Sequence, residues 1–261
     1  MKSLFRALLC SLVLLCVAAP AGAQIVDINA AVNKAGRQRM LSQRLAKLYL
    51  QIGQNVDAER SQRLLDASLA LFDRQLAELK NYAPTAPIKE TVQALEKSWT
   101  DYKALLAGAA PNPGNARRVM TLSEEVLGLA QQATAQLEKL AGTPSSRLVN
   151  IAGRERMLSQ RMSKLYQARA WNVAPEASGA DLEQLRREFL AGLAELEAAS
   201  ANNPAIREAL TLGRQQWIFF DAALKSQGDD KRILGTNVAT TSERILEVMD
   251  TVTGMVEKAA K

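Results

Sequence analysis

Residues 35–49 read AGRQRMLSQRLAKLY, and residues 152–166 read AGRERMLSQRMSKLY, 117 positions further along the chain. The two stretches differ only at the pairs Gln38/Glu155, Leu45/Met162 and Ala46/Ser163. Self-similarity at a long fixed spacing indicates a tandem repeat of one structural unit. We therefore expect two related domains, which we place at 24–142 and 143–261.

The pattern of apolar residues predicts helices in both halves. Apolar residues recur at three- and four-residue spacings, and no stretch alternates with a period of two. The predicted helices are 25–52, 58–81, 87–107, 115–141, 145–171, 179–200, 204–226 and 230–259. Short connections containing Pro or Gly between helices of this length are typical of antiparallel neighbours. We expect an all-α fold of two tandem antiparallel four-helix bundles, eight helices in all, related by a pseudo-twofold axis; a single longer eight-helix bundle is the alternative.

The N-terminus has the features of a secretory signal peptide. Lys2 and Arg6 form a positive start, residues 7–18 are apolar, and residues 21–23 are the small residues of a cleavage site. We expect residues 1–23 to be removed and the remaining chain to be periplasmic. An uncleaved anchor is the alternative, because the apolar run is close to the minimum length that spans a bilayer.

The composition argues against an enzyme. The 261 residues include no histidine, and the two cysteines, Cys10 and Cys16, lie within the predicted signal peptide. Without these residues a chain has no Ser-His-Asp triad, no Cys-His dyad and no imidazole or thiolate zinc site. No Gly-rich phosphate loop and no paired acid/base motif is visible in the sequence. We therefore expect no catalytic residue, no metal and no cofactor.

Charge and hydropathy restrict the partners. The net charge of +6 falls to +4 when Lys2 and Arg6 are removed with the signal peptide, and so small an excess does not predict binding to nucleic acid. No later run of about 18 apolar residues is present, so we expect the exported chain not to span a membrane.

The helix predicted at 25–52 has two apolar faces. One face consists of Leu41, Leu45, Leu48 and Ile52, and the opposite face of Ile28, Val32, Ala35, Ala46 and Leu50. Arg39 lies in the middle of the second face, with Gly36 beside it. Since a helix with two apolar faces must bury both, we expect this helix to pack against something besides its own bundle.

The repeat places Arg156 and Gly153 at the equivalent positions of the second half. A glycine inside a helix costs about 1 kcal/mol relative to alanine, and in return it allows another backbone to approach closely. If the two first helices pack on each other, Arg39 and Arg156 converge, and two buried guanidinium groups are unfavourable unless an anion lies between them. Alternatively, these arginines are structural and bind carboxylates or carbonyls of other helices.

The motif Ala35-Gly36-x-x-Arg39-Met40-x-Ser42-x-Arg44 resembles the signature of the PilJ/NarX-like family. This family comprises the N-terminal domain of type IV pilus methyl-accepting chemotaxis transducers and the periplasmic domain of nitrate/nitrite sensor kinases. In the nitrate sensors, a four-helix domain pairs with a second copy and binds nitrate between the first helices. The resemblance implies ligand-binding roles for Gly36, Arg39, Gly153 and Arg156.

Other charged residues of the motif receive secondary roles. The resemblance implies a signalling role for Arg44 and Arg161, and from the residues themselves we expect salt bridges at Arg44, Arg161, Arg37 and Arg154. Glu155 is placed to neutralise part of the charge of Arg156. We expect Lys47 and Lys164 to lie on solvated faces.

Two functions remain. The first is a periplasmic sensor or binding protein for a small oxyanion, nitrate or nitrite, held between the first helices of the two repeats. The second is an adaptor without a small ligand, which docks on a membrane receptor, a type IV pilus component or a transporter through its apolar helix faces.

Overall fold

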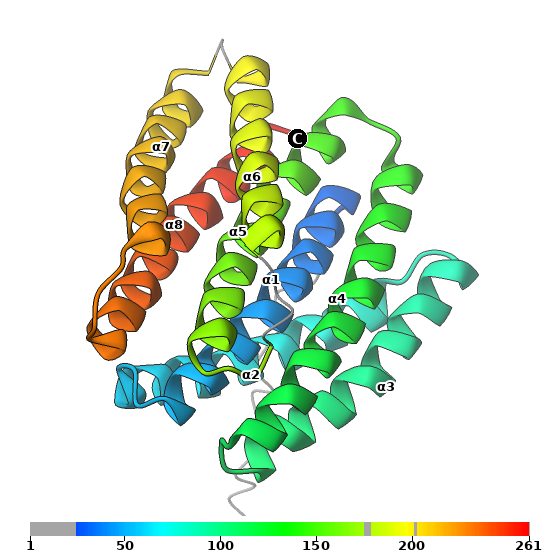
Figure 1. The fold of residues 1–261 in the computed structure, drawn as a ribbon. Helices are drawn as coiled ribbons and strands as arrows, with labels where there is room; N and C mark the ends of the chain where they lie inside the picture. The colour runs from blue at the N-terminus through cyan, green and yellow to red at the C-terminus, as the bar shows by residue number, and fades with distance from the viewer. Residues whose placement is uncertain (1–24, 175–178, 201–202, 261) are drawn as a thin grey trace, which may run out of the picture.

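The computed structural model describes residues 25–174, 179–200 and 203–260 (Figure 1). These residues form eight helices and no strand. The helices are α1 (Ile28–Gly53), α2 (Ala58–Tyr82), α3 (Ala86–Gly108), α4 (Pro113–Ala141), α5 (Pro144–Ala170), α6 (Gly179–Ala199), α7 (Pro204–Lys225) and α8 (Lys231–Ala259). The all-α prediction and its division into two tandem sets of four helices are confirmed. The predicted signal peptide, residues 1–23, lies outside the described residues.

Local sequence signals define the ends of these helices. The side chain of Asp27 accepts a hydrogen bond from the backbone N–H of Ala30 at 2.7 Å and caps α1. Proline occupies the first turn of α4 and of α5, where its missing N–H costs nothing. Between these two helices, Gly142 adopts a left-handed conformation with φ of 61° and ends α4. The turn at residues 142–143 therefore joins the two repeats tightly.

The two first helices lie at the centre of the molecule. In the first repeat α1 packs against α2 and α4, and in the second repeat α5 packs against α6 and α8, while α1 and α5 form the most extensive helix pair of all. Figure 1 shows α7 and α8 on one side of this central pair and α3 and α4 on the other. The partner that the second apolar face of α1 requires is therefore α5, the same helix of the other repeat.

The two repeats share one core. The ring of Phe72 stacks on that of Trp99 with centroids 3.8 Å apart, and Phe189 stacks on Trp217 in the same way at 4.6 Å. These aromatic residues belong to a single cluster of buried side chains that extends from Ile25 to Val256. The protein thus consists of two four-helix units whose hydrophobic cores are continuous through the α1–α5 pair.

None of the eight helices in the described part of the chain combines the length and the hydropathy needed to cross a bilayer.

Candidate functional site

Two glycines lie where α1 crosses α5. A Cβ atom added to Gly153 would lie 4.0 Å from the Cα atom of Gly36, so the two backbones approach closely here. The same added atom would lie 3.2 Å from Nη2 of Arg156 and 3.5 Å from Nη2 of Arg39. Both guanidinium groups therefore reach the crossing, and both arginine residues are fully buried. We call this group of Gly36, Arg39, Gly153 and Arg156 the arginine crossing.

Arg39 has only neutral acceptors. Its Nη1 atom donates to Oε1 of Gln131 at 2.6 Å. Its Nη2 atom donates to Asn150, at 2.7 Å to the side-chain oxygen and at 3.3 Å to the backbone carbonyl. Nε of Arg39 is buried and has no hydrogen-bond partner among the described residues. The positive charge of Arg39 is therefore solvated by amide groups, and no carboxylate of the described residues hydrogen-bonds to it.

Arg156 has the same arrangement with one difference. Its Nη2 atom donates to Asn33, at 2.6 Å to the side-chain oxygen and at 3.3 Å to the carbonyl. Its Nη1 atom donates to Oδ1 of Asp250 at 2.5 Å, and Asp250 also forms an ion pair with Arg37. Nε is again unpartnered within the described part of the chain. Arg156 thus has a carboxylate where Arg39 has an amide.

The environment disfavours the charged form of both arginines. Burial lowers the pKa of Arg39 to about 9, and the charge of Arg156 acts in the same direction. Burial also lowers the pKa of Arg156, to about 10, with Asp250 opposing the effect. Both side chains remain protonated at neutral pH, so two cations are held in a space that favours a counter-charge.

Sequence reasoning missed the asparagines that hold these arginines. Asn33 and Asn150 are 117 residues apart, like the motif itself, and each accepts a hydrogen bond from the arginine of the other repeat. Each asparagine in turn donates to a carboxylate, Asn33 to Glu257 and Asn150 to Glu138. Their spacing of 117 residues is a signal that could have identified them, because it extends the repeated unit upstream of Ala35.

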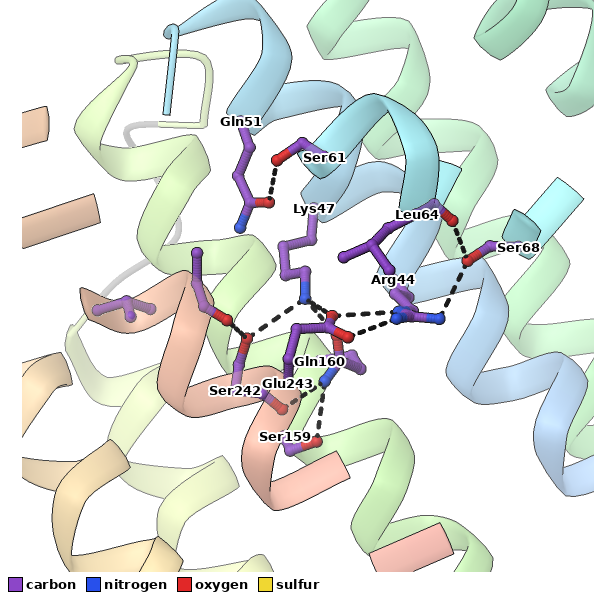
Figure 2. Close-up of polar contacts among 12 residues, drawn as sticks. Arg44, Lys47, Gln51, Ser61, Leu64, Ser68, Ser159, Gln160, Ser242 and Glu243 are labelled. Atoms are coloured by element: carbon purple, nitrogen blue, oxygen red, sulfur yellow. Dashed lines mark hydrogen bonds and ion pairs between the residues drawn. The ribbon is translucent and has the colours of Figure 1, made fainter. Parts of the chain in front are cut away.

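A second cluster lies next along α1 and joins it to α8. Figure 2 shows Arg44 and Lys47 converging on the carboxylate of Glu243, and both form ion pairs with it. Lys47 also donates to Oε1 of Gln160 at 2.6 Å, and Nη1 of Arg44 donates to the hydroxyl of Ser68 at 3.2 Å. We call this cluster the α1–α8 clamp. It connects the first helix of one repeat to the fourth helix of the other.

The equivalent α5–α4 clamp is formed by the second repeat. Lys164 and Arg161 both form ion pairs with Glu124 of α4. The expectation that Lys47 and Lys164 are solvated is wrong, because both lysines are fully buried between the repeats. Their buried amine groups are tolerated because each has a carboxylate and further polar acceptors in contact.

Glu243, the carboxylate of the α1–α8 clamp, remains ionised at acidic pH. Burial alone would raise the pKa of Glu243, but the charges of Lys47 and Arg44 outweigh it and lower this pKa to about 2. The four expected salt bridges are present. Arg37 pairs with Asp250 and Arg44 with Glu243. Arg154 pairs with Glu188 and Arg161 with Glu124.

Glu155 does not neutralise Arg156. It packs against α6, where a Cβ added to Gly192 would lie 2.1 Å from its Oε1 atom, and Arg156 hydrogen-bonds to Asp250 and Asn33 instead. Burial raises the pKa of Glu155 well above its usual value of 4.5, because the charge of Arg154 does not compensate for the loss of water. Glu155 is therefore a buried carboxyl group outside the arginine crossing.

Among the described residues, the arginine crossing and the two clamps are made of buried cationic donors bonded to amides, carbonyls and carboxylates. Within residues 25–174, 179–200 and 203–260, no group of three or more His, Cys, Asp or Glu side chains is positioned to hold a metal ion. The arginine crossing brings two buried guanidinium groups together, and each clamp ties the first helix of one repeat to the fourth helix of the other.

The comparison with known proteins agrees with this architecture. The family model described as the type IV pili methyl-accepting chemotaxis transducer N-terminal domain matches residues 23–124 and again residues 135–236. No curated protein and no solved structure gives a significant match. Because the two matches together cover most of the chain, the protein belongs to the family of type IV pili methyl-accepting chemotaxis transducer N-terminal domains and contains two copies of this domain in tandem.

Proposed function

We propose that this protein is a periplasmic sensor for a small oxyanion, nitrate or nitrite, which binds at the arginine crossing. Family membership indicates a sensory or interaction module of a chemotaxis or pilus system. The ligand and its site go beyond that membership and rest on the geometry of Gly36, Arg39, Gly153 and Arg156.

One observation carries the proposal. Arg39 and Arg156 are both completely buried, they approach the same pair of glycines, and each retains an Nε donor without a partner among the described residues. Among the described residues, one carboxylate, Asp250, hydrogen-bonds directly to the pair. A buried charge without a counter-charge is costly, and a planar anion between two guanidinium groups would supply charge-assisted hydrogen bonds to both.

Binding at this position requires a movement. Because both guanidinium groups are closed to solvent, an anion reaches them only when α1 and α5 separate. The ligand then stabilises the packing of α1 and α5 in which both arginines turn from Asn33 and Asn150 towards it. A ligand that binds one packing more tightly than the other shifts the population between them.

The clamps provide a route for the output. Lys47 on α1 is tied to Glu243 on α8, and Lys164 on α5 is tied to Glu124 on α4. A displacement of α1 relative to α5 therefore moves the fourth helix of each repeat, and these helices also carry α3 and α7. The signal would reach the outer surface of both repeats.

Titration calorimetry with nitrate and with nitrite tests the proposal. We expect heat of binding and a rise in melting temperature for the unaltered protein, and loss of both in Arg39→Gln. Arg154→Gln is the matched control, because it removes the same charge from an exposed ion pair on α5. Absence of heat and of any thermal shift with either anion in the unaltered protein would overturn the proposal.

A second candidate function is an adaptor that binds a protein partner of the chemosensory, pilus or transport machinery. Ile218 and Phe219 on α7 are 65% and 59% exposed, whereas the equivalent positions of α3 carry Thr100 and Asp101. Two adjacent, exposed, large apolar side chains can form part of a surface that binds a partner. In a pull-down from periplasm, the adaptor predicts a partner that survives Arg39→Ala and is lost when Ile218→Thr and Phe219→Asp are combined.

A further inference from the structure

The outer face of α7 carries exposed apolar side chains. Its inner face packs on α6 and α8 and buries Trp217 and Phe220, and Figure 1 shows α7 at the outer edge of the second repeat. Leu212, Ile218 and Phe219 are exposed. No other helix in the described part of the chain exposes more than one large apolar side chain. The outer face of α7 is therefore a candidate interaction surface.

The first repeat does not have this surface. Its α3 corresponds to α7, because Trp99 of α3 stacks on Phe72 as Trp217 stacks on Phe189, 118 positions later. At the same spacing, the three exposed apolar residues of α7 are replaced in α3 by Ala94, Thr100 and Asp101. The fold that both repeats share therefore does not require apolar side chains at these positions.

The exposed residues of α7 follow the spacing of a coiled-coil seam. In such a seam, residues recur at alternating steps of three and four along one helix face. The exposed residues at these steps are Glu208, Thr211, Gln215, Ile218, Ala222 and Lys225. Leu212 and Phe219 lie directly beside this row. A second helix that packs along the row would therefore cover all three exposed apolar side chains.

The charges at the two ends of the row favour one partner. The row begins with the acidic Glu208 and ends with the basic Lys225, and its steps read the same in both directions. Two antiparallel copies of α7 would therefore place Glu208 of each copy opposite Lys225 of the other. Lys225 also pairs with Asp221 of its own helix, but its side chain stays 58% exposed. Parallel copies would instead bring like charges together at both ends, which is unfavourable.

We propose that α7 packs antiparallel against α7 of a second copy of this chain and forms a twofold dimer. In this arrangement Leu212 of one copy lies near Phe219 of the other, and Ile218 lies opposite Gln215. Since only the second repeat carries the surface, pairing uses it up in both copies and closes the assembly at two. The dimer does not depend on nitrate binding at the arginine crossing. It uses the surface that the adaptor function would offer to a different protein, so the two occupants compete.

Sedimentation equilibrium of the purified protein over a range of concentrations tests the proposal. We expect a reversible monomer–dimer equilibrium in the unaltered protein. Phe219→Asp, which copies Asp101 of the first repeat, should weaken dimerisation about tenfold or more, because it removes an apolar contact from the interface. A protein that stays monomeric at all concentrations would overturn the proposal and leave the surface to a different partner.

Exchanging the charges at the ends of the row tests the antiparallel arrangement. Glu208→Lys and Lys225→Glu should each weaken dimerisation about tenfold, because like charges would then face each other at both ends. An equimolar mixture of the two variants should recover dimers that contain one copy of each, since opposite charges again meet at both ends. A mixture that associates as weakly as the separate variants would contradict the antiparallel pairing.

Glu90→Lys is the matched control. Glu90 is exposed and occupies the position of α3 that is equivalent to Glu208, 118 residues earlier. The variant makes the same change of net charge on the other repeat and should leave dimerisation unchanged. Equal weakening by Glu90→Lys and Glu208→Lys would reduce the effect to general electrostatic repulsion and contradict the assigned surface.

Discussion

Gln131 in the first repeat takes the place that Asp250 has in the second, since each accepts a hydrogen bond from Nη1 of the buried arginine of its own repeat. This exchange of an amide for a carboxylate makes the two halves of the arginine crossing electrostatically unequal. The positive charge of Arg39 is the less compensated of the two, and an anion at the crossing would therefore interact most strongly with Arg39.

Gln131→Glu should remove this inequality. The new carboxylate would pair with Arg39 directly, and because position 131 is exposed, its own desolvation cost is small. We expect the free energy of unfolding to rise by about 1 kcal/mol and nitrate affinity to fall about tenfold, since the anion and the new carboxylate compete for one cation. Urea unfolding and calorimetry measure the two effects. Unchanged nitrate affinity would contradict the position of the ligand.

The α1–α8 clamp predicts a specific loss of stability in acid. The pKa of Glu243 is lowered in the folded protein to about 2, from a usual value of 4.5. As the pH falls, Glu243 is therefore protonated in the unfolded chain before it is protonated in the folded protein. The stability that the clamp contributes is complete above about pH 4.5 and is lost as the pH falls towards 2.

Glu243→Gln tests the clamp. We expect it to lower the free energy of unfolding at pH 7 by about 3 kcal/mol, because Lys47 would be left buried without a counter-charge, and to flatten the acid dependence. Glu124→Gln, in the more exposed α5–α4 clamp, should have a smaller effect. If both variants leave the free energy of unfolding at pH 7 almost unchanged, the clamps do not hold the repeats together.

Glu155 predicts the opposite dependence on pH. Burial raises its pKa, so the folded protein retains a proton that the unfolded chain releases, and stability falls as the pH rises above about 4.5. Glu155→Gln copies Gln38 of the first repeat, whose amide donates to the carbonyl of Phe72 at 3.3 Å. We expect the variant to raise the melting temperature at pH 8 and to match the unaltered protein near pH 4. A gain that is independent of pH would contradict this explanation.

The close approach of α1 and α5 predicts an unusual response to alanine. Replacing a glycine inside a helix by alanine raises the free energy of unfolding by about 1 kcal/mol where the added Cβ has space. We expect this gain for Gly254→Ala, where an added Cβ meets nothing within 4 Å. Gly153→Ala should lose it, because its Cβ would press on Nη2 of Arg156 at 3.2 Å. Thermal unfolding compares the two variants. An equal rise in melting temperature in both would show that the helix crossing can accommodate an added methyl group.

The fold was largely predictable from local patterns. Helical periodicity and the Pro and Gly connections located the eight helices, and the second apolar face of α1 predicted that it packs outside its own repeat. The repeated Gly36 and Gly153 pointed to α5 as the partner. These features are encoded within one helix or repeated at one spacing, so the sequence alone displays them.

The buried charges were not predictable in the same way. Lys47 is tolerated in the interior only because Glu243 contacts it, and Glu243 lies 196 residues away on the fourth helix of the other repeat. Gln131 and Asp250 lie 119 rather than 117 residues apart, so the motif spacing does not align them. Contacts of this kind depend on how the repeats pack, and no pattern within one helix reports them.

A crystal structure of the protein soaked with nitrate is the most direct measurement of the central claim, that a small oxyanion binds between α1 and α5. We predict a planar ion at the crossing, with its oxygen atoms about 3 Å from guanidinium nitrogens of both Arg39 and Arg156. If both arginines instead keep Asn150 and Asn33 as acceptors at saturating nitrate, with no ion between the helices, the claim is wrong.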